Sequence, residues 1–188
     1  MSKISYSPLQ EPIWHPATAF FSRRAPAQFQ NWLTDRDSLT QQLISHCQGQ
    51  FCVKVLRQYW QRPFSSEYHQ LGLKHGNTAF IREVHLYCDQ QPWVFARTVI
   101  PTETLRGELQ KLTQLGAQPL GAVLFSNHSI KRAPLEIARF NSKSAMYNEA
   151  HINSAHHQDI WGRRSLFYLG NKPLLVNELF LGNIPQKD

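Results

Sequence analysis

The amino-acid sequence predicts an α+β fold built around an antiparallel sheet. Two segments, 78–100 and 163–180, each contain two runs rich in β-branched and aromatic residues separated by a short turn, which is the pattern of a β-hairpin. Helical patterns lie between these hairpins and do not alternate one for one with strands, which favours antiparallel pairing. At 188 residues, the chain is long enough for one domain, 1–188, with a substantial core.

Hydrophobic periodicity places the other elements in order along the chain. Residues 1–25 contain prolines and no regular pattern, and we expect an extended lead-in there. The expected helices begin after Pro26, after a cap at Asp37 or Ser38, after Pro101 and at Pro119, and further strands are expected at 51–60 and 135–140. Their inward-facing residues are Phe29, Trp32 and Leu33, then Leu39, Leu43 and Ile44, then Leu105, Leu109 and Leu112. Residues 61–77 are expected to form a long loop with at most a short helix.

Composition narrows the class of protein and its compartment. The formal net charge is +7, but the basic residues are scattered and form no recognised nucleic-acid-binding motif, so a nucleic-acid partner is not expected. No run of 18 apolar residues predicts a membrane span, and the first residues lack a secretory signal. Cys47, Cys52 and Cys88 are odd in number and lack zinc-site spacing, which predicts reduced thiols in a cytoplasmic protein.

Three charged residues interrupt apolar rows on the predicted strands. Alternate residues of a strand share a face, so Glu178 lies on the row of Val176 and Phe180, and Arg82 on the row of Phe80 and Val84. Arg97 in the same way shares a row with Trp93, Phe95 and Val99. A charge on a core-facing row needs a partner or a function.

Two interpretations of these charges stay open. One is a buried salt bridge between Arg82 and Glu178, or an arginine whose head reaches water at a strand end. The other is an enclosed pocket in which guanidinium groups bind a small carboxylate and Glu178 binds a neutral or proton-bearing group.

Other candidate sites are weaker. His151, His156 and His157 do not share one helix face, and their spacing matches no metal motif, so we expect a solvated loop there. The segment Gly162-Arg163-Arg164-Ser165 has a lone glycine and no phosphate-loop spacing. No metal or organic cofactor is therefore expected.

Several motifs, in their order along the chain, resemble the chorismate pyruvate-lyase family across residues 28–182. They are Phe80-Ile81-Arg82-Glu83-Val84, Ala96-Arg97-Thr98-Val99-Ile100-Pro101, Pro119-Leu120-Gly121, Trp161-Gly162-Arg163-Arg164-Ser165 and Lys172-Pro173-Leu174-Leu175 followed by Glu178-Leu179-Phe180. The resemblance implies conversion of chorismate to 4-hydroxybenzoate and pyruvate without a cofactor, as the first step of ubiquinone synthesis, with inhibition by the product. It implies a compact α+β domain whose ligand lies beneath two helical flaps, and it makes 141–160 partly an inserted loop.

The resemblance also implies the site. Arg82 and Glu178 are the expected catalytic residues, and Leu39, Arg82, Leu120 and Glu178 the expected substrate contacts, with Leu39 in place of a methionine. Arg82 is expected to pair with the ring carboxylate and Glu178 to bind the C4 hydroxyl, while Arg97 assists at the side-chain carboxylate. Whether Glu178 is also a base stays open.

Three further expectations accompany this interpretation. The chain is expected to be a monomer. The rival function is a non-catalytic sensor or carrier of small aromatic acids on the same fold, which resembles the effector domain of some bacterial transcription regulators. A related lyase that makes another hydroxybenzoate is the third possibility.

Overall fold

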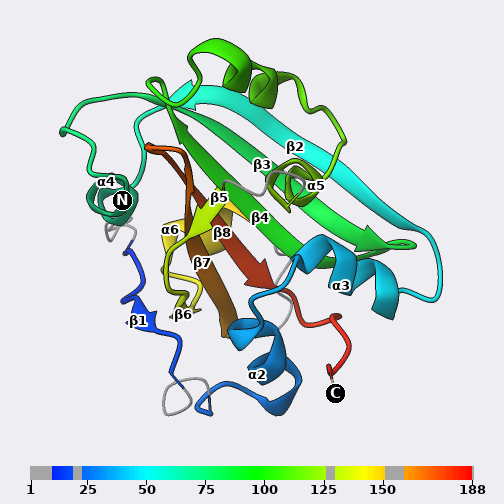
Figure 1. Ribbon diagram of the computed structural model, residues 1–188. Coiled ribbons are helices and arrows are strands. Elements are labelled where there is room, and N and C mark those ends of the chain that lie inside the picture. The colour runs from blue at the N-terminus through cyan, green and yellow to red at the C-terminus, as the bar shows by residue number, and fades with distance from the viewer. Residues whose placement is uncertain (1–9, 19–22, 126–129, 151–158, 188) are drawn as a thin grey trace, which may run out of the picture.

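The computed structural model describes residues 10–18, 23–125, 130–150 and 159–187 (Figure 1). Within these ranges eight strands form one sheet, in the order β1-β6-β7-β8-β4-β3-β2, with β5 added beside β7. The strands are β1 (His15–Pro16), β2 (Phe51–Gln61), β3 (Ala79–Cys88), β4 (Gln91–Pro101), β5 (Ile130–Arg132), β6 (Glu136–Phe140), β7 (Ile160–Leu169) and β8 (Lys172–Phe180). Every described pair in this sheet is antiparallel, so the predicted α+β fold class is confirmed.

The helices follow the predicted order. They are α2 (Ala27–Thr34), α3 (Leu39–His46), α4 (Ser65–Leu71), the 3₁₀ helix η1 (Gly107–Gln114), α5 (Leu120–Phe125) and α6 (Ala145–Glu149). In α2 the helically spaced Phe29, Trp32 and Leu33 are buried as predicted. The prediction for Ile44 is wrong, because 45% of this residue is exposed on α3. The segment expected to be a loop, 61–77, contains α4.

Turn chemistry sets the register of the final hairpin. Gly170 has a φ of 63°, a left-handed conformation that glycine adopts at little cost, and it joins β7 to β8 with a two-residue turn. Leu169 therefore pairs with Lys172, and the same register brings Arg163 opposite Glu178. This register fixes which side chains of β7 and β8 share a face.

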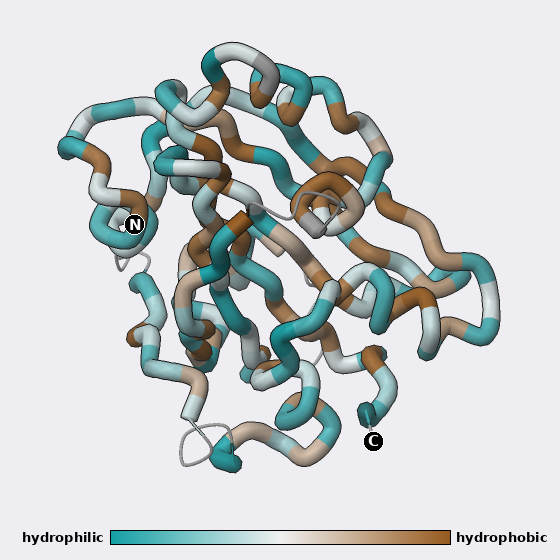
Figure 2. Tube along the Cα trace, in the orientation of Figure 1, coloured by the Kyte–Doolittle hydropathy of each residue, from teal (hydrophilic) through white to brown (hydrophobic). Residues whose placement is uncertain are grey.

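Hydrophobic clusters pack on both faces of the sheet. Figure 1 shows α3 and α5 in front of the sheet, and the apolar residues of Figure 2 concentrate in the strands and in α5. On the opposite face, Phe95 and Leu179 pack with Met146 and Tyr147 of α6. On that same side, Glu67 of α4 is bonded to the side chain of Arg97. The face covered by α3 and α5 carries the site described below.

The prediction of reduced thiols is wrong for two of the three cysteines. Cys47, which follows α3, forms a disulfide with Cys88 at the end of β3, with their Cα atoms 5.6 Å apart. Cys52 is a free, exposed thiol. Tertiary folding brings together two cysteines 41 residues apart, which no local spacing motif indicates. Because disulfides are characteristic of oxidising compartments, cysteine usage no longer supports a cytoplasmic location.

Two segments without a clear sequence pattern contribute to the fold. In the expected lead-in, β1 pairs with β6, and the carboxylate of Glu11 accepts hydrogen bonds from the backbone N–H groups of Ser65 and Ser66 at the start of α4. The segment 141–160 contains α6 and the first residue of β7, while His151, His156 and His157 lie outside the described residues. None of the helices in the described ranges is long and apolar enough to span a membrane.

Candidate active site

A pocket lies between the sheet and two helices, α3 and α5. We call these two helices the helical cover. Its floor contains Val84, Ala96, Thr98 and Val176, all from one face of β3, β4 and β8. The pocket encloses about 570 Å³ of empty space, part of which is its opening to solvent. A concave, mainly apolar lining with a few charged groups is typical of sites at which proteins bind small organic molecules.

The roof of the pocket depends on a close contact within the helical cover. Leu39 of α3 and Leu120 of α5 are both buried and line the pocket. A Cβ atom on Gly121 would lie 3.0 Å from Oγ1 of Thr40, so glycine allows α5 to approach α3 this closely. The two leucines named in the sequence analysis thus line the same cavity.

Arg82 is a buried cation at the β3 side of the pocket. Only 3% of it is exposed, and its Nη2 donates to the backbone oxygens of Gly116 (2.8 Å) and Gln118 (3.0 Å) in the segment that leads into α5. Its Nε is buried without a hydrogen-bond partner among the described residues, and within them it forms no ion pair. Burial lowers the pKa of Arg82, because the cation has lost much of its hydration. An anion bound here would supply the missing charge and acceptor.

Glu178 lies across the pocket floor from Arg82, on β8. Its Oε2 accepts a 2.6 Å hydrogen bond from Nε of Arg163, to which it is directly paired across the β7–β8 hairpin. This excludes the salt bridge between Arg82 and Glu178 that the sequence left open. Among the described residues no hydrogen bond reaches Oε1 of Glu178, so this oxygen can accept one from a ligand.

Arg163 holds this carboxylate in place and also anchors the end of α2. It is 1% exposed, and its Nη1 donates to the backbone oxygens of Trp32 (2.7 Å) and Asp35 (2.6 Å) around the end of α2. The charge-assisted pair therefore fixes both the position of Glu178 and the docking of α2 on the sheet.

The separation of the two charges follows from the sheet. Arg82 is on β3 and Glu178 on β8, with β4 between them, and both point to the face of Ala96 and Thr98. Neighbouring strands are about 4.8 Å apart, so the two backbones are on the order of 10 Å apart across the sheet. The pocket thus has a cationic side and a carboxylate side with an apolar floor between them.

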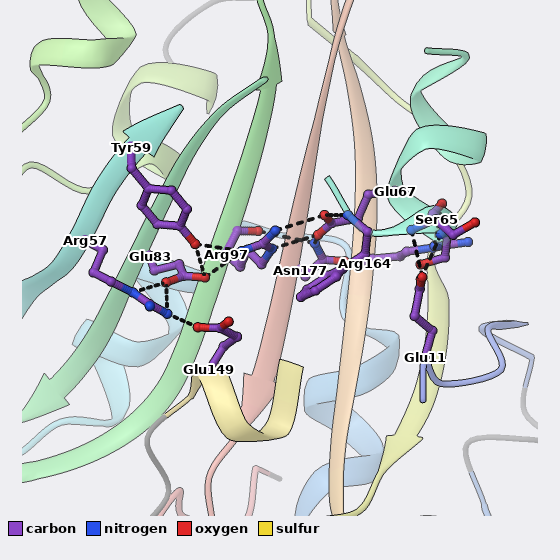
Figure 3. A network of polar contacts seen from close by, with 12 residues as sticks. Glu11, Arg57, Tyr59, Ser65, Glu67, Glu83, Arg97, Glu149, Arg164 and Asn177 are labelled. Carbon is purple, nitrogen blue, oxygen red and sulfur yellow. Dashed lines mark hydrogen bonds and ion pairs between the residues drawn. The ribbon is translucent and has the colours of Figure 1, made fainter. Parts of the chain in front are cut away.

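Arg97 does not line this pocket. It pairs with Glu83 on β3 and points to the opposite face of the sheet, where it is 1% exposed (Figure 3). Its Nε and Nη2 bind both oxygens of Glu67 at 2.9 and 3.1 Å, and its Nη1 binds Glu83 at 2.6 Å and Tyr59 at 3.1 Å. Burial alone would lower the pKa of Arg97, but the charges and hydrogen bonds of these partners raise it above its usual value. The expectation that Arg97 assists at the substrate does not agree with this position, and the proposals below do not use it.

The sequence analysis assigned no role to two arginines that the structure brings to the pocket, Arg132 and Arg163. For Arg163 a signal was present, because a two-residue turn at Gly170 places it opposite Glu178. Arg132 is on the three-residue strand β5, beside Phe167 of β7, and the sequence pattern of so short a strand gives no signal.

The fold and the pocket define a small α+β protein with a charged ligand pocket between an antiparallel sheet and a helical cover. The sequence model of one family, chorismate lyase, matches residues 8–187. A relative from Aromatoleum aromaticum is 42% identical, covering 86% of this chain and 88% of the relative, and one from Nitrosospira multiformis is 37% identical, covering 91% and 93%. Both carry the name "Probable chorismate pyruvate-lyase". The chain therefore belongs to the chorismate lyase family, a family of lyases.

Two solved structures of other proteins have a similar fold. PhnF from Mycobacterium smegmatis matches with a TM-score of 0.59 and 12% identity, over 80% of this chain and 66% of that one. The C-terminal domain of the histidine utilization repressor from Pseudomonas syringae matches with a TM-score of 0.55 and 10% identity, over 74% and 96%. At these identities the likeness is one of fold alone.

Proposed function

We propose that this protein converts chorismate to 4-hydroxybenzoate and pyruvate. The observation that carries the proposal is the pair Arg82 and Glu178, a guanidinium with an unused donor and a carboxylate with an unused oxygen, on opposite sides of one pocket. Membership in the chorismate lyase family and the names of the relatives support the same activity.

The two ends of the ligand match the two sides of the pocket. The ring carboxylate of chorismate and its C4 hydroxyl lie at opposite ends of a six-membered ring. Arg82 would bind the carboxylate through its unpartnered Nε–H and its positive charge, and Oε1 of Glu178 would accept a hydrogen bond from the hydroxyl. The flat ring would lie on Val84, Ala96 and Val176, beneath Leu39 and Leu120 of the helical cover.

The reaction needs little covalent work from the protein. The bond between C3 and the ether oxygen breaks, the hydrogen at C4 is lost, and the ring becomes aromatic, while the enolpyruvyl group leaves and becomes pyruvate. Aromatisation makes this elimination favourable, so the protein mainly orients the ligand and stabilises charge. Arg82 and the Glu178–Arg163 pair are charges that the fold has already positioned before the substrate arrives.

Two roles are compatible with the position of Glu178. In the first, its free oxygen removes the C4 hydrogen as a base. In the second, that hydrogen passes directly to the methylene carbon of the enolpyruvyl group in a cyclic six-atom transition state, and Glu178 only binds the hydroxyl. The hydrogen bond from Arg163 occupies one carboxylate oxygen, so either role uses the other oxygen.

The decisive experiment incubates purified protein with chorismate and quantifies 4-hydroxybenzoate and pyruvate. We expect equal yields of the two products, a loss of activity in Arg82→Met and in Glu178→Gln, and unchanged activity in Arg106→Met, whose side chain is exposed. Absence of turnover by the wild-type protein would refute the proposal. Another hydroxybenzoate as product would favour the related lyase.

A sensor or carrier is the second candidate, because the fold also occurs in the C-terminal domain of a repressor. The same samples test it by isothermal titration calorimetry with 4-hydroxybenzoate. Tight binding that depends on Arg82, together with no conversion of chorismate, would favour the sensor over the lyase.

Further parts of the proposal follow from enclosure and family. A product bound to Arg82 and Glu178 beneath the helical cover leaves only when these contacts break, so we expect slow release and competitive inhibition by 4-hydroxybenzoate. An inhibition constant far above the KM for chorismate would contradict this. The family, and no longer the cysteine usage, supports the proposed setting, in which the protein is a cytoplasmic monomer whose product enters ubiquinone synthesis.

A further inference from the structure

Chorismate carries two carboxylates, and Arg82 accounts for only one of them. The inference about the group that binds the second carboxylate rests on the function proposed above. Arg97 is not available, because Glu67 and Glu83 occupy it on the opposite face of the sheet. The remaining cations that line the pocket are Arg132 and Arg163, both close to Glu178.

Of these two cations, Arg163 is already paired with the carboxylate of Glu178, whereas Arg132 has no carboxylate partner among the described residues. Its Nε and Nη2 donate to Oγ of Ser165 at 3.1 and 2.7 Å, and its Nη1 donates to the backbone oxygen of Arg36 at 2.6 Å. The side chain lies over the ring of Phe167, with 5.2 Å between Cζ and the ring centroid. One N–H on each terminal nitrogen therefore has no partner among the described residues and is available to donate to a carboxylate.

The charge balance around Arg132 favours an added anion. Among the described residues no carboxylate forms an ion pair with it, although Asp37 and Glu178 are near enough to act on its charge. The pKa of Arg132 is lowered to about 10, mainly by burial and to a smaller extent by the positive charge of Arg163. The pocket lining holds three arginines against Asp37 and Glu178, so it carries a net positive charge before a dianion binds.

The connectivity of the substrate determines which end of the pocket receives the second carboxylate. The enolpyruvyl ether is on C3, the neighbour of the carbon that carries the hydroxyl. A ligand whose C4 hydroxyl binds Glu178 therefore directs its C3 substituent to the same side of the pocket, away from Arg82. Arg132 and Arg163 are the cations on that side.

We propose that Arg132 binds the enolpyruvyl carboxylate of the substrate. Arg163 supports this site by its charge while it holds Glu178. The product 4-hydroxybenzoate has no such carboxylate, so Arg132 is a specificity residue that contributes to binding of the substrate and not of the aromatic product.

The test compares substrate and product in the same variant. In Arg132→Met we expect kcat/KM for chorismate to fall on the order of 100-fold, because a charge-assisted carboxylate contact is lost, while the inhibition constant of 4-hydroxybenzoate changes less than about threefold. Arg82→Met should weaken both, and Arg106→Met neither. Arg132→Lys keeps the charge without the fork and should restore part of kcat/KM.

The outcomes separate this inference from the function on which it rests. Equal weakening of substrate and product in Arg132→Met would assign Arg132 a structural role, through Ser165 and Arg36, and overturn the inference. Unchanged kcat/KM would overturn it as well. If Arg132→Met does not fold, Arg132→Lys is judged by the same comparison, with a selective fall for chorismate as the supporting result. Absence of turnover by the wild-type protein refutes the proposed function itself.

Discussion

The same substitution at two buried arginines on neighbouring strands, Arg82 and Arg97, should change protein stability by very different amounts. Arg97 is 1% exposed and has bonds to both Glu67 and Glu83, whereas Arg82 is 3% exposed and has only backbone acceptors. Replacing each by methionine removes the charge and keeps most of the apolar volume. Comparison of the two variants therefore distinguishes a cation that stabilises the fold from a cation proposed to bind a ligand.

The expected magnitudes follow from the partners. In Arg97→Met, Glu67 and Glu83 stay buried without their main counter-charge, which costs about 3–5 kcal/mol of unfolding free energy. The lower end is expected, because Asn177 still donates to Glu67, and Arg57 and Tyr59 to Glu83. In Arg82→Met, two hydrogen bonds are lost but the cost of burying an unpaired cation is removed, so we expect a change of less than about 1 kcal/mol.

Urea denaturation with and without 4-hydroxybenzoate measures both effects. A ligand at 100 times its Kd should stabilise the wild-type protein and Arg97→Met by about 2.7 kcal/mol each and should not stabilise Arg82→Met. The exposed Arg106→Met serves as the control for loss of one positive charge. The reasoning would be refuted if Arg82→Met lost 3 kcal/mol or more, or if Arg97→Met unfolded like the wild type.

Three more predictions address the geometry of Glu178, the disulfide and the chemistry. A Cβ atom at position 162 would lie 2.8 Å from the backbone oxygen of Glu178, so Gly162→Ala should shift Glu178 and lower kcat at least about tenfold in steady-state kinetics. An unchanged kcat would show that catalysis does not depend on the precise position of Glu178. Reduction of the disulfide between Cys47 and Cys88, or Cys47→Ser, should lower the unfolding free energy by about 4 kcal/mol in urea denaturation, as expected for a separation of 41 residues. Cys52→Ser should lower it little, and equal effects of the two serine variants would contradict this prediction. If Glu178 is only a binding group, mass spectrometry should find deuterium from C4 of chorismate in the methyl group of pyruvate, and its loss to solvent would support a base.

Strand periodicity was sufficient to find the two central charges of the site. Arg82 and Glu178 interrupt apolar rows, and a period of two fixes the face on which each side chain lies once one neighbour is known to be buried. The partner of Glu178 could also have been found, because the turn at Gly170 determines that Arg163 is directly opposite.

The position of Arg97 could not be predicted in this way. Near the turn of the first hairpin, Cys88 pairs with Gln91, and the continuation of that register would place Arg97 opposite Arg82. The register shifts by one residue between Leu86 and Tyr87, and every side chain of β4 beyond this bulge changes its partner. Arg97 therefore pairs with Glu83 and points away from the pocket. Pro92 beside the extra residue Trp93 is the one nearby sequence signal, since proline in a strand occurs mainly at strand ends, edges and bulges, but it does not fix the register.

The position of Arg132 and the pairing of the cysteines depend on tertiary structure. Arg132 reaches the pocket because β5, a strand of three residues, pairs with the end of β7 beyond β6. Cys47 meets Cys88 only after α3 has packed over the end of β3. Such contacts between segments far apart in the chain leave no periodic signal, because periodicity reports only which face of one element is buried.

The two faces of the sheet use buried charge for different purposes. On the face of α4, Arg97, Glu67 and Glu83 satisfy one another and connect β3, β4 and the helix (Figure 3). On the face of the helical cover, Arg82 has an unused Nε. Buried charge without a partner destabilises a fold, so a protein can keep such a group only if other interactions offset the cost. The paired network directly behind the pocket is well placed to do so, because it holds the same strands that carry the unpaired groups. A bound dianion would complete the pairing on the pocket face, and its loss as two separate products would restore the unpaired state for the next substrate.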